Sequence, residues 1–227
     1  MRGLCREGST DCGVDHKLKC MKWNGFDVLE TYIGERISEY DVISDARNKA
    51  LTQMARQIRE EVDSCGQAKL IFICTHNSRR SHLGHLWAQL AASFFGVDGI
   101  YCYSGGTEVT AFNPQAVKAL EGAGMHISRL DESSNPVYQV SFSDQQARIS
   151  TFSKKYTDPP NPTDKFIAVM TCSDADEACP VVQGAIYRYA IHYEDPGAFD
   201  GAHEETAQYA ERCRQIAREM LYLFSRV

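Results

Sequence analysis

The sequence predicts an α/β fold, in which an open, mainly parallel sheet of four strands carries helices on both faces and follows a helical N-terminal extension. Two observations support this fold class. Short apolar runs rich in β-branched and aromatic residues alternate with segments of helical length and periodicity, a pattern typical of parallel sheets covered by helices. In addition, 43% of the 227 residues are hydrophobic and 24% are charged, which is the composition of a folded globular protein.

The chain divides into three parts. Residues 1–24 are polar and aperiodic, and we expect a mobile leader. Residues 25–66 form a helical extension, because apolar side chains recur every three to four residues between Ala46 and Val62. Residues 67–227 form the main domain. Its predicted strands lie at residues 69–74, 100–103, 166–171 and 186–193, and its predicted helices at residues 81–95, 114–120 and 203–224.

A polar stretch over residues 131–165 interrupts this alternation. It contains Asn135 followed by a proline and the sequence DPPNP at 158–162, so we expect a long surface excursion and a candidate lid over a site. Lys154 and Lys155 could reach an anion from this stretch. A solvated charge pair is the preferred interpretation of these two lysines.

Charge and apolar patterning limit the classes of partner. The chain has 24 Lys and Arg against 30 Asp and Glu, a net charge of −6, so it has no overall positive field to attract nucleic acid or an anionic membrane. The longest apolar run, near residues 70–74, is far shorter than the roughly 20 residues that cross a bilayer. No apolar stretch typical of a secretory signal opens the sequence. We therefore expect a cytoplasmic protein that binds neither nucleic acid nor membrane.

The cysteines are typical of a reduced protein. Nine of them are spread over the whole chain, and an odd, dispersed set is unlike a disulfide scaffold. Four possible metal ligands lie in the leader, but their gaps match no zinc-binding pattern. These residues are Cys5, Cys12, His16 and Cys20. We expect no metal site and no bound cofactor.

The segment CTHNSRRS, from Cys74 to Ser81, carries the most chemical information. A turn between a buried strand and a helix start directs backbone N–H groups and the positive end of the helix dipole into one concavity, which suits a tetrahedral oxyanion. The same field favours the nucleophilic thiolate form of Cys74, and the guanidinium of Arg80 can hold two anion oxygens. Ser81 can cap the helix or donate to the thiolate. The other residues expected in the oxyanion loop are Thr75, His76, Asn77, Ser78 and Arg79.

A C-x5-R pattern also has a plainer interpretation. Cys74 would then be the buried last residue of a strand, and Arg80 a surface charge. The position of the pattern between a buried strand and a helix start favours the oxyanion loop.

Three further segments of the sequence carry distinctive motifs besides this loop. They are YSGGT at 103–107 with Asn113-Pro114, the triplet EDP at 194–196, and TCSDADEACP at 171–180. Over residues 69–225, the four segments together resemble the low-molecular-weight tyrosine phosphatase superfamily and, within it, the thioredoxin-coupled arsenate reductases. The resemblance implies that Asp195 is a general acid and that Cys172 and Cys179 are redox cysteines.

The sequence departs from the pattern of these families at three positions. His76 stands where the superfamily usually has glycine, and Arg79 stands where it usually has a second loop cysteine. The shape and charge of the loop are therefore expected to differ. His85 stands where some reductases have a glutamate of a cation site, so no potassium ion is expected.

The two activities of the superfamily need different residues. Hydrolysis of a phosphate ester needs a nucleophile, an anion cradle and an acid for the leaving oxygen, roles that are open to Cys74, Arg80 and Asp195. Arsenate reduction also needs two electrons, which a thiol–arsenate adduct supplies when a second cysteine attacks the first sulfur, so that arsenite leaves and a disulfide remains. That role suits Cys172, with Cys179 as the resolving cysteine.

The spacing of these two cysteines sets a condition. If residues 172–179 formed one helix, the two Cα atoms would lie about 10 Å apart, whereas a disulfide accepts about 4.4–6.8 Å. The segment must therefore be irregular or unwind before the bridge forms. Two structural cysteines near a strand end are the alternative.

We expect an arsenate reductase that a dithiol protein such as thioredoxin recycles. The alternative is a phosphatase that hydrolyses phosphotyrosine or small phosphate esters, but such enzymes often have a tyrosine after the Asp-Pro element, and this chain has Gly197. A non-catalytic anion-binding module, with residues 25–64 as an interaction helix, is a third possibility. The presence of the cysteine, the arginine and the acid argues against it.

Overall fold

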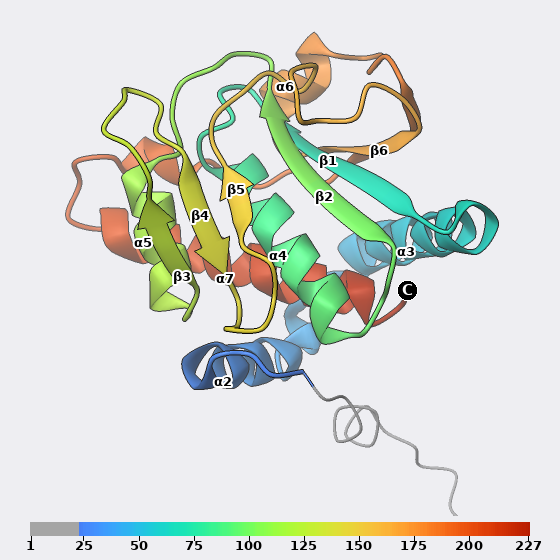
Figure 1. Ribbon diagram of the computed structural model, residues 1–227, viewed down its shortest axis with the longest axis horizontal. Helices are drawn as coiled ribbons and strands as arrows, with labels where there is room; N and C mark the ends of the chain where they lie inside the picture. Colours follow the sequence, from blue (N-terminus) through green and yellow to red (C-terminus); the bar gives the residue numbers. More distant parts are fainter. Residues whose placement is uncertain (1–22) are drawn as a thin grey trace, which may run out of the picture.

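The computed structural model describes residues 23–227, and the leader residues Cys5, Cys12, His16 and Cys20 lie outside them. A parallel sheet of four strands forms the centre (Figure 1), which confirms the predicted fold class. The strand order is β2 (Ile100–Gly106), β1 (Ala68–Cys74), β6 (Phe166–Met170) and β7 (Ala185–Ala190). Because β1 lies between β2 and β6, its last residue, Cys74, has a neighbouring strand on each side at the C-terminal edge of the sheet.

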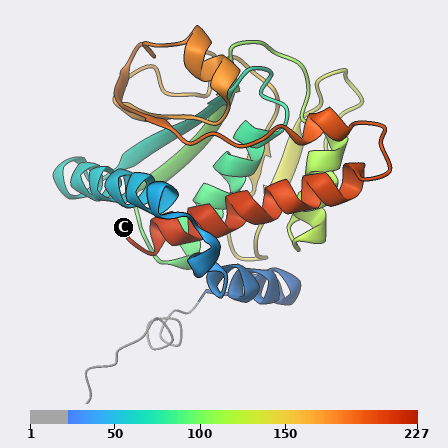
Figure 2. The ribbon, with the colours of Figure 1, turned by 180° about the vertical axis from the view of Figure 1, so that it is seen from behind.

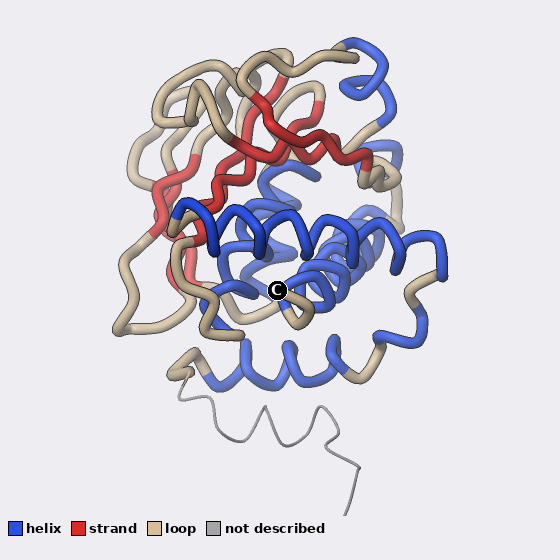
Figure 3. Tube along the Cα trace, turned by 90° about the vertical axis from the view of Figure 1, so that its right-hand side faces the viewer, coloured by secondary structure: helices blue, strands red, loops and turns tan. Residues whose placement is uncertain are grey.

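Side chains of β1 alternate between two hydrophobic cores, as the pleat of a strand requires. Leu70 and Phe72 belong to the larger core, and Ile71 and Ile73 to the smaller one. The larger core contains residues of the helices α2 (Asp27–Ile37), α3 (Asp45–Cys65), α4 (Arg80–Phe94), α5 (Pro114–Gly122) and α7 (Glu205–Phe224). Helix α7 packs on each of the other four helices (Figure 2). Figure 3 shows most of the helices on one side of the strands.

The opposite face of the sheet has a thinner cover. The short helix α6 (Ser173–Ala178) packs on β1 and β6 through Ala175. Tyr156 and Val182 from the flanking loops complete the smaller core. This thin layer contains the segment that joins Cys172 to Cys179.

The N-terminal extension is helical, with α2, the short 3-10 helix η1 (Tyr40–Val42) and α3. Helix α3 begins after Ser44, whose hydroxyl accepts a hydrogen bond from the Arg47 N–H, and ends at Gly66 in a left-handed conformation. Side chains of both α2 and α3 are fully buried against the larger core, including Ile33 and Ile58. The extension therefore shares the core of the domain that follows it.

Residues 131–165 differ from the predicted surface excursion. They contain β4 (Tyr138–Ser141) and β5 (Ile149–Thr151), which pair with β3 (His126–Arg129) in a three-stranded antiparallel sheet. Val140 is fully buried in the larger core. Strands of three or four residues are too short to show a clear alternation of apolar and polar residues, which is why the sequence pattern did not predict them.

The expectation of a solvated pair at Lys154 and Lys155 is wrong for the first lysine. Lys155 is exposed, but Lys154 is only 5% exposed. Its backbone N–H donates to Asn77 Oδ1 and its carbonyl accepts from the Gly106 N–H, which holds this part of the chain against the predicted oxyanion loop. Within residues 23–227, no helix is long and apolar enough to cross a membrane.

Candidate active site

The predicted nucleophile loop joins the end of β1 to the start of α4. Cys74 is the last residue of β1 and is 4% exposed. Its Sγ atom lies 3.1 Å from the hydroxyl oxygen of Ser81, in the first turn of α4. No side chain caps this helix, so of the two roles predicted for Ser81, the structure shows the contact with the thiol.

Asn77 determines the shape of the loop. Its φ angle is 45°, in the left-handed region that asparagine adopts more readily than most residues. Its amide donates to Ser81 Oγ at 2.8 Å, and its amide oxygen accepts from the Lys154 N–H at 2.9 Å. Because the left-handed conformation falls on Asn77, the neighbouring His76 can stand in place of the usual glycine without backbone strain. The His76 side chain is half-exposed and lies 3.5 Å from the Glu108 carboxylate.

The surrounding chain binds the carbonyl groups of the loop. The His76 carbonyl accepts from the hydroxyls of Thr110 and Ser153, each at 3.0 Å. The Thr75 carbonyl accepts from the Glu108 N–H, and the Ser78 carbonyl from the Asn113 N–H. In these bonds the loop contributes only acceptors, so its N–H groups can serve an oxyanion.

Gly106 allows this loop to approach β2. It pairs with Cys74 in the sheet register, and a Cβ atom at this position would lie 2.6 Å from the Thr75 carbonyl oxygen and 2.7 Å from the Asn77 nitrogen. Any larger residue would therefore displace the loop. The YSGGT segment indicated this glycine only as part of a family pattern.

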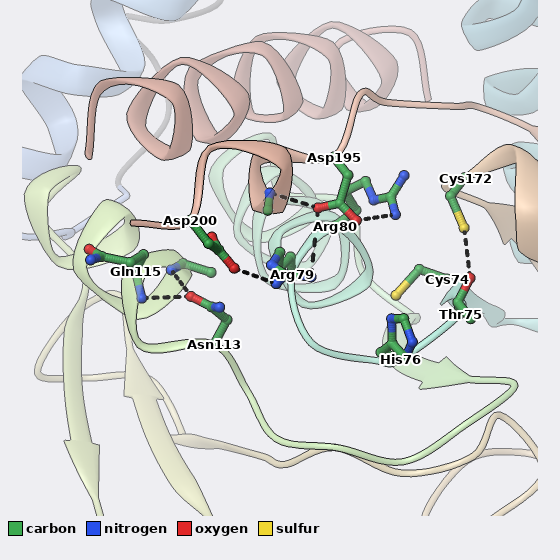
Figure 4. A network of polar contacts seen from close by, with 12 residues as sticks. Cys74, Thr75, His76, Arg79, Arg80, Asn113, Gln115, Cys172, Asp195 and Asp200 are labelled. Atoms are coloured by element: carbon green, nitrogen blue, oxygen red, sulfur yellow. Dashed lines mark hydrogen bonds and ion pairs between the residues drawn. The ribbon is translucent and has the colours of Figure 1, made fainter. Parts of the chain in front are cut away.

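Arg80 is buried and paired, which excludes its interpretation as a surface charge. The side chain donates to the Tyr193 carbonyl at 3.0 Å and to the Asp195 carboxylate at 2.6 Å. Asp195 also accepts from the Gly197 N–H at 3.0 Å, where it caps the 3-10 helix η2 (Pro196–Phe199). The structure thus brings the loop arginine and the predicted acid into direct contact (Figure 4).

Arg79 connects the loop to the segment after Asp195. Its guanidinium donates to Tyr209 Oη at 2.7 Å and to the Asp200 carboxylate at 2.8 Å. Burial and the nearby Asp200 raise the pKa of Tyr209, and its hydroxyl donates to Asp200. A Cβ atom at Gly197 would lie 2.6 Å from the Arg79 Cζ atom. The Arg79 guanidinium therefore lies directly against position 197, where the phosphatases often have a tyrosine.

The second predicted cysteine lies beside the loop. Cys172 is 1% exposed and shares the smaller core with Cys74. Its Sγ atom lies 3.6 Å from the Thr75 hydroxyl oxygen (Figure 4). Cys172 precedes α6 and the partly exposed Cys179 follows it. The two thiols thus flank a helix, and the condition derived from their spacing applies: α6 must unwind before they can bond.

The other cysteines of the main domain have structural positions. Cys102 and Cys213 are buried in the larger core. Burial raises the pKa of Cys213 to about 12, and its sulfur accepts a hydrogen bond from the Trp87 indole. Burial likewise raises the pKa of Cys102. These two thiols are therefore neutral at pH 7.

A buried cationic side chain lies behind the loop. Burial lowers the pKa of Lys154 from 10.5 to about 8, and no carboxylate of residues 23–227 lies within ion-pair distance of its ammonium. The histidines His82 and His85 are also buried, and burial together with Lys154 lowers the pKa of His85 to about 3. Both imidazoles are therefore neutral at pH 7. The sequence pattern did not predict this cluster.

Lys154 should make stability depend on pH. Between pH 8 and 10.5 the folded state binds fewer protons than the unfolded state, so the free energy of unfolding rises with pH in this window. Lys154→Met should remove this rise, about 1–2 kcal/mol between pH 8 and 9.5, and should stabilise the protein at pH 7 by up to about 3 kcal/mol. Urea unfolding at several pH values measures both effects. Lys155→Met is the matched control, and parallel pH curves for the wild type and Lys154→Met would contradict the prediction.

A cavity of about 390 Å³ opens beside the loop. Residues of the loop and of the segment before α5 line it, among them His76, Arg79, Thr110 and Phe112. Neither Cys74 nor Arg80 belongs to this lining.

No protein-family model matches the chain. The arsenate reductase of Bacillus licheniformis is 27% identical to it over 156 residues, which are 69% of this chain and 94% of that protein. The arsenate reductase of Bacillus subtilis is 29% identical over 145 residues, 64% of this chain and 86% of that protein. Among solved structures, the low-molecular-weight protein tyrosine phosphatase of T. tengcongensis has a TM-score of 0.49 and 13% identity, covering 71% of this chain and 100% of that one.

The two sequence relatives confirm the resemblance to arsenate reductases that the sequence motifs indicate. Both sequence relatives are arsenate reductases, so the chain is similar to that class of enzymes.

Proposed function

We propose that this protein reduces arsenate to arsenite with three cysteines. The observation that supports this function best is the position of Cys172, a buried thiol whose sulfur lies 3.6 Å from the hydroxyl of Thr75 in the nucleophile loop. Ester hydrolysis needs no second thiol, whereas arsenate reduction does. The names of the sequence relatives point to the same reaction.

The proposed reaction begins at Cys74. Its thiolate attacks arsenic while the loop N–H groups and Arg80 bind the remaining oxygens, and Asp195 protonates the oxygen that leaves as water. Cys172 then attacks the Cys74 sulfur, the S–As bond breaks, and its electron pair stays on arsenic as arsenite leaves. Two thiols have been oxidised to a disulfide, and arsenic(V) has been reduced to arsenic(III).

Cys179 completes the relay. Its thiolate attacks Cys172 and releases the Cys74 thiolate, which leaves a Cys172–Cys179 disulfide without further net oxidation. A dithiol protein of the thioredoxin type reduces that disulfide, and the partly exposed position of Cys179 suits this exchange. No bound cofactor is needed. A reducing compartment such as the cytoplasm would supply the partner.

Hydrolysis of a phosphate ester is the second candidate function. The contact between Arg80 and Asp195 favours it, because hydrolysis needs an anion-binding group and an acid at one site. The surroundings of Gly197 argue against aromatic esters, since the Arg79 guanidinium lies where an aromatic side chain at position 197 would begin.

One preparation of the full chain can distinguish the two functions. Arsenate-dependent oxidation of NADPH, coupled through thioredoxin and thioredoxin reductase, measures reduction, and release of p-nitrophenol from its phosphate ester measures hydrolysis. We expect reduction to be the faster reaction. Hydrolysis without any arsenate-driven thiol oxidation would favour the phosphatase.

The role of Asp195 can be tested with leaving groups of different basicity. An acid matters most when the leaving oxygen is strongly basic. Asp195→Asn should therefore slow hydrolysis of phenyl phosphate about a hundredfold or more, and that of p-nitrophenyl phosphate much less. Steady-state rates for the two esters measure the difference. Equal losses would remove Asp195 from the acid role, and Asp200→Asn, a carboxylate on the same segment that does not contact Arg80, is the control.

A further inference from the structure

One guanidinium holds the C-terminal end of α6. Arg188, on the edge strand β7, donates to the Asp176 carbonyl at 2.7 Å and to the Cys179 carbonyl at 3.1 Å. The same group lies 2.5 Å from the Asp176 carboxylate. The Nε2 atom of His192 lies 3.1 Å from the other oxygen of that carboxylate. Three acceptor groups of the segment between the redox cysteines therefore converge on one side chain of the neighbouring strand.

These contacts hold in place the segment that must move before a Cys172–Cys179 bond can form. The two cysteines flank the six helical residues of α6, so the bond forms only when the helix unwinds. Both carbonyls bound by Arg188 belong to its last turn and C-cap. Unwinding α6 would break the contacts of Arg188 with Asp176 and Cys179, which are charge-assisted and stronger than neutral hydrogen bonds.

We propose that Arg188, paired with Asp176, is a positioning residue that stabilises the dithiol form of the Cys172/Cys179 pair. It holds α6 helical while the thiols are reduced and so opposes disulfide formation until Cys172 has formed a disulfide with Cys74, a step in which arsenic takes up the two electrons. The role of Arg188 in turnover rests on the proposed reductase function. The effect of Arg188 on the dithiol–disulfide equilibrium is independent of that function, since the equilibrium can be measured without arsenate.

The test uses the full chain with Cys74→Ser, so that Cys74 cannot form a disulfide with Cys172. The protein is equilibrated with reduced and oxidised dithiothreitol. Two protein thiols give two electrons and two protons to the cyclic disulfide of the reagent, which becomes a dithiol. Acid quenching and peptide mass mapping then give the fraction of Cys172–Cys179 disulfide and the equilibrium constant.

We expect Arg188→Ala to shift this constant about five- to tenfold toward the disulfide. Arg129→Ala is the matched control, because Arg129 also bonds two backbone carbonyls and an acidic side chain, far along the chain from the cysteines. Asp176→Asn should shift the constant in the same direction by less, and Arg188→Lys, which keeps a cationic donor on a shorter side chain, should lie between wild type and Arg188→Ala. Asp176→Asn also provides the test should Arg188→Ala not fold.

The outcomes separate the two proposals. Constants for Arg188→Ala and Asp176→Asn within twofold of that for Arg129→Ala, or shifted toward the dithiol, would overturn the role of Arg188. Faster hydrogen exchange confined to residues 173–179 in reduced Arg188→Ala would support it, because that is the segment whose opening competes with the contacts. If wild-type protein shows no arsenate-driven thiol oxidation, the reductase function fails while the equilibrium measurement stands.

Discussion

Cys74→Ser should abolish both arsenate reduction and ester hydrolysis, with a loss of at least about a thousandfold in each. Both proposed reactions begin with attack by this sulfur, and a serine hydroxyl is not activated by the same surroundings. Arg80→Lys should lower both activities about a hundredfold, since an ammonium cannot hold two oxygens in the fork geometry of a guanidinium. Initial rates in the two assays measure these losses, with circular dichroism to establish that each variant folds.

Chemical modification gives a readout of Cys74 that does not depend on turnover. Iodoacetate carries an anion that the loop N–H groups can bind, so it should alkylate Cys74 at pH 6 faster than neutral iodoacetamide does. Phosphate, arsenate or sulfate should protect it. Cys65, exposed at the end of α3 in the same chain, is the internal control. Alkylation of Cys74 no faster than that of Cys65, without protection by anions, would contradict the assignment of the loop.

The elements around the loop were predictable because their signals are local. The run KLIFIC becomes the buried strand β1, and the apolar segment after Ser81 becomes α4. A strand end and a helix start separated by five residues define the loop between them. The position of Cys74 and Arg80 therefore followed from patterns within about a dozen residues.

The contacts that complete the site join distant parts of the chain, and local patterns do not contain them. Arg80 and Asp195 are 115 residues apart, and Arg79 and Tyr209 are 130 residues apart. Asp195 was predicted only through the family resemblance, and nothing in the sequence indicated Tyr209. Burial of Lys154 was missed for the same reason, since the groups that cover it come from other elements.

Cys172→Ser and Cys179→Ser should each stop multiple-turnover arsenate reduction and leave most ester hydrolysis intact. The proposed reduction passes from Cys74 through Cys172 to Cys179, and the proposed hydrolysis needs neither of the last two. Cys102→Ser is the control for loss of a buried thiol outside the relay. The coupled NADPH assay and p-nitrophenol release measure the two activities on each variant.

The two variants should also stop at different points. Cys179→Ser should still release one arsenite per protein and accumulate a disulfide between Cys74 and Cys172, because both thiols lie in the smaller core and the next nucleophile is missing. Cys172→Ser should form no disulfide with Cys74. Peptide mass mapping after acid quenching identifies the trapped bond. If Cys179→Ser turns over repeatedly, or if both variants lose hydrolysis together with reduction, the relay is wrong, since the cysteines would then be needed for the structure of the loop rather than for the transfer of electrons.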